Sequence, residues 1–169
     1  MRRVILGVAA LVAATPAAAR ADAIARPSRA EGATTARIVA STAARERPGG
    51  GRLVWRVATR TSWSQQAQTL LVLAARRDAL KVLLPIRPNG TAAWIPRRKA
   101  LLAHTPYYVR VRLRSRRVIV YRDGRRIRRL RAVVGAPATP TPTGLAAIYE
   151  RNPQGDRHGF LAAARQKKR

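Results

Sequence analysis

The sequence of 169 residues contains no cysteine. This absence excludes disulfides, cysteine zinc sites, iron–sulfur clusters and thiol nucleophiles. Aromatic residues are also scarce, at 5% of the chain. Because large side chains supply most of the apolar area that folding buries, we expect a small core of low stability.

Acidic residues are few, with 7 Asp and Glu against 35 Lys and Arg, for a formal net charge of +28. The basic residues are almost all arginine, whose planar fork binds phosphate and carboxylate groups. Nucleic acid, anionic lipid and acidic wall polymers are therefore candidate partners. A codon bias toward Ala, Arg, Gly and Pro would give the same composition without any ligand, and the composition alone leaves both interpretations open.

The first 21 residues have the three parts of a secretory signal peptide. A positively charged start is followed by the apolar run Val4–Ala14 and by a small-residue cleavage site at 19–21. The apolar run is too short for a membrane span, so no transmembrane anchor is expected after cleavage. This pattern predicts an extracytoplasmic chain, located in the cell wall or secreted. An alanine-rich helix is the alternative.

Residues 22–52 mix Ala, Arg, Thr, Ser and Pro without a sustained period and end in three glycines at 49–51. This composition predicts a flexible leader. From residue 53 onward, short apolar runs at 69–73, 80–84 and 92–95 predict β-strands, and the prolines and Asn-Gly of 85–90 predict a turn. Residues 53–104 are therefore interpreted as a small barrel resembling the SH3-like modules of wall-binding proteins.

Three tryptophans occur in this part of the chain, Trp55, Trp63 and Trp94. They could line a sugar-stacking groove, although their spacing does not require one. For Trp94 we favour a core position with a satisfied indole N–H.

A second unit is expected from residue 105 to residue 169. Apolar and basic residues alternate over 109–114, which predicts a strand with Val109, Val111 and Leu113 buried. A further strand at 118–122 leads into Asp123-Gly124, a pair that suits a tight hairpin turn, and 127–134 predicts the return strand.

Ile127 and Leu130 are an odd number of residues apart, so the return strand needs a β-bulge if both are to face the same side. The arginines of this hairpin could bind a polyanion. We favour an ordinary solvated face, because export removes most nucleic acid and no aromatic residues interleave the arginines for base stacking.

The spacing of the potential catalytic residues does not indicate an active site. The serines at 28, 41, 62, 64 and 115 have no spacing that pairs them with His104 or His158, which argues against a serine triad. Glu150, Asp156 and His158 are three loosely spaced potential metal ligands, a pattern more typical of a solvated turn. We therefore assign no catalytic, cofactor-binding or metal-binding residue and expect no cofactor.

The most specific pattern is the segment Gly135–Gly144, in which proline recurs at positions 137, 140 and 142. Proline at this spacing forbids a helix and predicts an extended strap. The sequence of this segment is Gly-Ala-Pro-Ala-Thr-Pro-Thr-Pro-Thr-Gly, and it follows a Tyr-Arg-Asp-Gly hairpin and Val133-Val134. It closely resembles the N-terminal part of L,D-transpeptidase catalytic domains. The resemblance extends upstream to 82–90, and more weakly downstream to 152–156 and Gly159-Phe160.

The resemblance implies an all-β fold, in which an SH3-like barrel precedes the partial sheet of an L,D-transpeptidase domain. It also implies a family role in peptidoglycan cross-linking and cell wall organisation. In that family, a His and a Ser-His-Gly-Cys-x-Arg segment perform acyl transfer through a thiolate. Here His158-Gly159 is followed by Phe160, and the chain is expected to be truncated before that segment and inactive.

Three functions remain open at this point. The first is an inactive L,D-transpeptidase family protein, and the second is a non-catalytic cationic protein that binds the cell wall. The third is a basic nucleic-acid-binding protein. Peptidoglycan stem peptides or anionic wall polymers are the expected partners, and nucleic acid is not expected.

Overall fold

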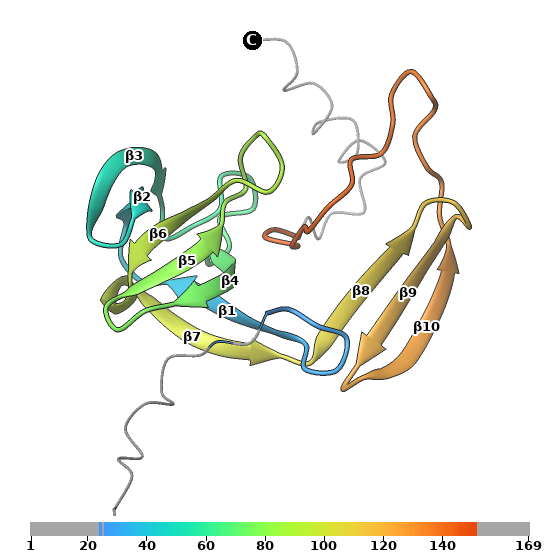
Figure 1. Cartoon of the computed structure of the whole chain (residues 1–169), viewed down its shortest axis with the longest axis horizontal. Coiled ribbons are helices and arrows are strands. Elements are labelled where there is room, and N and C mark those ends of the chain that lie inside the picture. The colour runs from blue at the N-terminus through green and yellow to red at the C-terminus, as the bar shows by residue number, and fades with distance from the viewer. Residues whose placement is uncertain (1–23, 25, 152–169) are drawn as a thin grey trace, which may run out of the picture.

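The computed structural model describes residue 24 and residues 26–151. These residues form two antiparallel β-sheets joined end to end, with one short 3-10 helix, and the predicted all-β class is confirmed (Figure 1). The signal-peptide prediction for residues 1–21 lies outside the described residues. No helix in the described part of the chain is both long and apolar enough to cross a membrane.

The first sheet has seven strands in the order β3-β2-β6-β5-β4-β1-β7. The strands are β1 (Ala33–Ile38), β2 (Thr42–Arg47), β3 (Gly50–Val57), β4 (Thr69–Ala75), β5 (Ala79–Leu83), β6 (Ala92–Pro96) and β7 (Ala100–Thr105), with helix η2 (Arg97–Lys99) before β7. The three strands predicted at 69–73, 80–84 and 92–95 are thereby confirmed as β4, β5 and β6.

The interpretation of residues 22–52 as a flexible leader is wrong for most of its length. Strand β1 lies inside the sheet and pairs with β4 on one side and β7 on the other. Ala36 and Ile38 are buried, and Arg37 between them is exposed. The strand is therefore stabilised by small apolar side chains at a two-residue period. Gly49, with a positive φ angle, lies in the turn between β2 and β3, and Gly51, also with a positive φ angle, lies at the start of β3, so these glycines do not form a linker.

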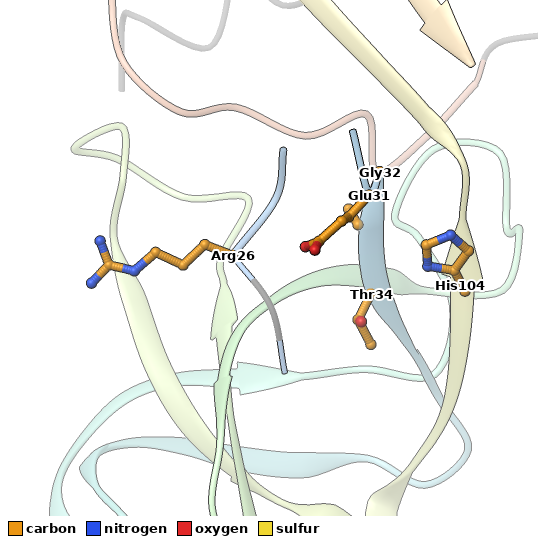
Figure 2. Close-up of a pocket in the computed structure, with 6 residues that line it drawn as sticks. Arg26, Glu31, Gly32, Thr34 and His104 are labelled. Atoms are coloured by element: carbon orange, nitrogen blue, oxygen red, sulfur yellow. The ribbon is translucent and has the colours of Figure 1, made fainter. Parts of the chain in front are cut away.

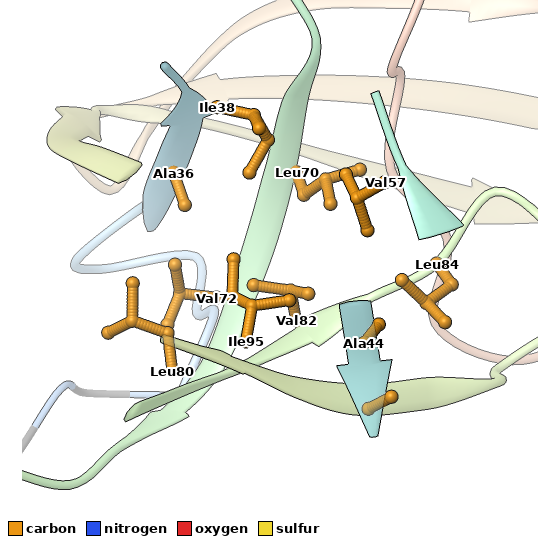
Figure 3. Close-up of a cluster of buried hydrophobic side chains, with 11 residues drawn as sticks. Ala36, Ile38, Ala44, Val57, Leu70, Val72, Leu80, Val82, Leu84 and Ile95 are labelled. Carbon is orange, nitrogen blue, oxygen red and sulfur yellow. The ribbon is translucent and has the colours of Figure 1, made fainter. Parts of the chain in front are cut away.

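One core lies within the curve of the first sheet (Figure 3). Its members are small aliphatic residues, and the set is Ala36, Ile38, Ala44, Val57, Leu70, Val72, Leu80, Val82, Leu84, Ala93 and Ile95. No aromatic side chain belongs to this buried set, in accord with the low aromatic content of the sequence. The core therefore depends on close packing of many small groups.

Trp94 is not the core tryptophan that we favoured from the sequence. Within β6, Ala93 and Ile95 are buried, whereas Trp94 between them is half-buried on the outer face. The guanidinium of Arg76 lies 5.7 Å from the centre of its ring. The two-residue period of the strand explains the correction, because a strand cannot turn three consecutive side chains inward.

The second sheet has three strands, β8 (Tyr107–Arg112), β9 (Arg117–Arg122) and β10 (Arg125–Arg131), in the order β10-β9-β8. Asp123 and Gly124 both have positive φ angles and form the predicted hairpin turn. The register shifts between Arg126 and Arg128, which confirms the β-bulge expected from the spacing of Ile127 and Leu130. The return strand ends at Arg131, short of the predicted residue 134.

The predicted burial of Val109, Val111 and Leu113 is wrong. Val109 and Val111 are 46% and 53% exposed, and Leu113 is half-buried in the turn after β8. Strict alternation correctly placed the two valines on one face of the sheet. It could not show whether another layer packs against that face, and within the described residues the face is largely open.

The two sheets meet at Pro106, which separates β7 from β8. The backbone N–H of Asp123, in the β9–β10 turn, donates to the carbonyl oxygen of Pro106 at 3.1 Å. The turn at 28–32 also packs on this junction. There Gly32 lies against the backbone of Pro106, and the Arg29 guanidinium lies 5.4 Å from the centre of the Tyr121 ring.

Candidate functional site

The segment after β10 is the one that carried the family resemblance. It contains no helix, as its prolines predict, but it is not the straight strap that we expected. The Thr139 N–H donates to the Ala136 carbonyl at 2.9 Å, and the Gly135 N–H donates to Thr141 Oγ1 at 2.7 Å. A Cβ on Gly135 would lie 2.8 Å from the Thr141 nitrogen, so the fold-back requires glycine there.

The whole segment from residue 132 to residue 151, called the strap from here on, arches from the end of β10 back to the loop that follows β3 (Figure 1). At its end, Glu150 Oε1 accepts hydrogen bonds from the Ser64 N–H at 2.6 Å, Ser64 Oγ at 2.7 Å and the Trp63 N–H at 3.2 Å. The Gln66 side-chain amide donates to the Arg151 carbonyl oxygen at 2.7 Å. These contacts connect residues more than 80 positions apart and hold the strap against the first sheet.

The pKa of Glu150 is lowered from its ordinary value of 4.5. Partial burial acts to raise the pKa, but hydrogen bonds from the Ser64 and Thr61 side chains and from the Ser64 and Trp63 backbone outweigh it. The carboxylate is therefore held in its charged form.

The three-stranded sheet presents an arginine face. Directly paired residues share a face, and the pairs Arg112–Arg117 and Arg117–Arg131 place three arginines in one row across the sheet. The arginines that this register brings to one side are Arg110, Arg112, Arg117, Arg126, Arg129 and Arg131. None of them forms an ion pair with another residue that the structure describes.

Two tyrosines lie on the same face and were missed in the sequence. Tyr108 and Tyr121 are paired across β8 and β9, with ring centres 6.4 Å apart. The prediction that no aromatic residues interleave the arginines is therefore wrong. Tyr121 is nevertheless buried beneath Arg29, so only Tyr108, which is half-buried, has exposed ring area. The two-residue period of β8 could have identified Tyr108, because counting back from Arg112 in steps of two places residue 108 on the same face.

The candidate nucleophiles do not form a catalytic group. His104 on β7 lines a shallow pocket of about 140 Å³ together with Arg26, Glu31, Gly32, Ala33 and Thr34, and no serine is among the lining residues (Figure 2). Among the described residues, no serine hydroxyl hydrogen-bonds to a histidine. Ser28 Oγ accepts from the Glu31 N–H, and Ser64 Oγ contacts Glu150 and Thr61.

The potential metal ligands are only partly within the described chain. Glu150 is bound by the loop after β3, while Asp156 and His158 lie outside the described residues. Over the part of the chain that the structure describes, no three His, Asp or Glu side chains gather as a metal site.

The three tryptophans do not form one groove. Trp55 is paired with the buried Ala44 and packs against the core, whereas Trp94 is paired with Arg45 on the outer face. Trp63 is 57% exposed in the loop after β3, beside the Glu150 carboxylate.

The second sheet and the strap lie in the part of the chain whose sequence matches a known family. Residues 106–168 match the model of the L,D-transpeptidase catalytic domain (YkuD). This C-terminal part of the chain is similar to the L,D-transpeptidase catalytic domain. The matched region begins at Pro106, where the first sheet ends, and includes the arginine face and the strap.

No curated protein and no solved structure matches the chain. The similarity to the L,D-transpeptidase family therefore depends on the sequence of residues 106–168.

Proposed function

We propose that the chain is a non-catalytic cell-wall protein of the L,D-transpeptidase family that binds anionic peptidoglycan material through its arginine face. We place it outside the cytoplasmic membrane, after removal of residues 1–21. The family match supports a role in cell wall organisation, and the SH3-like interpretation of the first sheet would supply a second wall contact.

The row of three arginines in the second sheet is the observation that carries the binding proposal. Like charges directly opposite one another destabilise a sheet, and here Arg112, Arg117 and Arg131 are adjacent without an acidic partner among the described residues. A bound anion would offset that repulsion. Stem-peptide carboxylates and wall phosphates both match the bidentate geometry of arginine.

The absence of cysteine supports the non-catalytic part of the proposal. The family's thiolate attacks a stem-peptide carbonyl to form an acyl-enzyme, and these 169 residues contain no thiol. No serine and histidine in the described residues are arranged to replace it. The chain should therefore recognise wall material without forming a covalent bond to it.

A carbapenem tests this part directly, because it acylates the family's nucleophile. The purified full chain is incubated with a carbapenem and its intact mass is measured, with a cysteine-containing L,D-transpeptidase as the positive control. We expect no mass increase in this chain. A stoichiometric adduct would show that a nucleophile is present and would overturn the proposal.

Nucleic acid is the competing polyanion. Binding of a DNA duplex is measured in parallel with binding to insoluble peptidoglycan at physiological salt. We expect retention by peptidoglycan and only weak, steeply salt-dependent DNA binding. Tight DNA binding that persists at physiological salt, with no retention by peptidoglycan, would favour the nucleic-acid function instead.

A further inference from the structure

The loop after β3 is arranged as a receptor for a carboxylate. Backbone N–H groups of Trp63 and Ser64 and the hydroxyl of Ser64 all donate to one oxygen of Glu150, at 3.2, 2.6 and 2.7 Å. Three donors directed at one point form the kind of concave anion site that successive backbone N–H groups create.

The loop is braced by its own hydrogen bonds, independently of Glu150. The Thr61 N–H donates to the Gln66 carbonyl at 2.9 Å, and the Gln66 N–H donates to Thr61 Oγ1 at 3.2 Å. Arg60 donates to the Gln65 carbonyl at 2.7 Å, and the Thr61 side chain is buried. A loop fixed in this way should keep its donors in place when the carboxylate leaves.

The contacts to the strap extend beyond the carboxylate. The Gln66 amide donates to the main-chain carbonyl of Arg151, the residue that follows Glu150. Trp63 is more than half exposed beside the site and offers an apolar surface to a neighbouring side chain. The loop thus binds an acidic side chain together with the next peptide carbonyl, which is the pattern of recognition for an acidic peptide.

We propose that the loop of residues 61–66 is a binding site for acidic peptides and that Glu150 of the strap occupies it as an internal ligand. An external peptide that carries a carboxylate competes with Glu150 for the same donors. The strap and the external peptide therefore exclude one another. This site is separate from the arginine face, and its test does not depend on wall binding.

The test uses the full chain and two synthetic probes. The first is a peptide of residues 146–151 with both ends blocked, and the second is the same peptide with glutamine at the position of Glu150. The amide resonances of Trp63 and Ser64 are followed by NMR, because a hydrogen bond to a carboxylate shifts an amide proton downfield. The variant Glu150→Gln empties the site of its charged ligand.

We expect the Trp63 and Ser64 amide protons to move upfield in Glu150→Gln and to move back when the acidic peptide is added. The glutamine peptide should bind about ten-fold or more weakly, since it lacks the charge-assisted hydrogen bonds. In the unmodified chain, Glu150 competes at an effective concentration of about millimolar, so the acidic peptide should act only above that range.

Three results would overturn the proposal. The two amide protons could be unchanged in Glu150→Gln, or the acidic and glutamine peptides could bind equally well. Alternatively, the amide resonances of β4, β5 and β6 could collapse in Glu150→Gln, which would make Glu150 a part of the fold rather than a replaceable ligand. The variant Ser64→Ala serves as a second check, because it removes one donor from the loop and should weaken binding of the acidic peptide.

Discussion

Gly32 lies so close to the carbonyl oxygen of Thr105 that a Cβ atom on Gly32 would overlap it. The same Cβ would lie 2.8 Å from the Pro106 Cα, and Gly32 has a φ of +68°. Both groups that it would meet are backbone, which cannot rotate away. This glycine therefore fixes the turn at 28–32 against the junction of the two sheets.

The variant Gly32→Ala should be destabilised by about 1–3 kcal/mol, because alanine is strained at this φ and must also displace the junction. Gly50→Ala is the matched control, since its added Cβ would meet no atom within 4 Å and its φ is not positive. Urea denaturation of the two variants measures the difference. Equal midpoints would show that the turn does not pack on the junction.

Leu80 is fully buried in the core of the first sheet. Its replacement by alanine should cost about 2–5 kcal/mol through lost burial and the cavity left behind. Leu101→Ala, at a position that is 52% exposed on β7, should change the free energy of unfolding by about 0.5 kcal/mol or less. Thermal melts followed by circular dichroism compare them, and a Leu101 effect as large as that of Leu80 would contradict the placement of the core.

The contact between the strap and the loop should depend on pH. Because the pKa of Glu150 is lowered in the folded chain, its contribution is fully present above the ordinary value of 4.5 and is lost as the pH falls through the lower folded value. The loop residues that donate to it do not titrate. The Ser64 amide resonance should therefore titrate with a midpoint below 4.5, and a midpoint above 4.5 would contradict the hydrogen-bond geometry.

Local patterns in the sequence predicted most strands and the hairpin turn. The alternation of apolar and basic residues predicted β8, and the Asp123-Gly124 pair predicted the turn. The spacing of Ile127 and Leu130 predicted the β-bulge. These features depend on neighbours within a few residues, so a single sequence is sufficient to identify them.

Features that depend on distant partners could not be predicted in this way. Strand β1 has a composition typical of a linker, and its residues alone do not indicate a strand. It is ordered because it pairs with β4 and β7. Glu150 was considered only as a metal ligand, because its partner loop lies more than 80 residues earlier. The sequence showed that the second unit is rich in arginine. The alignment of these arginines in rows across three strands follows only from the pairing register of β8, β9 and β10.

Binding to insoluble peptidoglycan by matched arginine variants tests the central claim most directly. The triple variant Arg112→Ala, Arg117→Ala and Arg131→Ala removes one row of the arginine face, and Arg37→Ala, Arg77→Ala and Arg98→Ala removes the same charge from exposed positions of the first unit. Each protein is sedimented with peptidoglycan at physiological salt. We predict that the unmodified chain and the control variant pellet, whereas much more of the row variant stays in solution, with its stability unchanged or raised. Equal pelleting of the two variants, or an unmodified chain that remains in solution, would contradict the account.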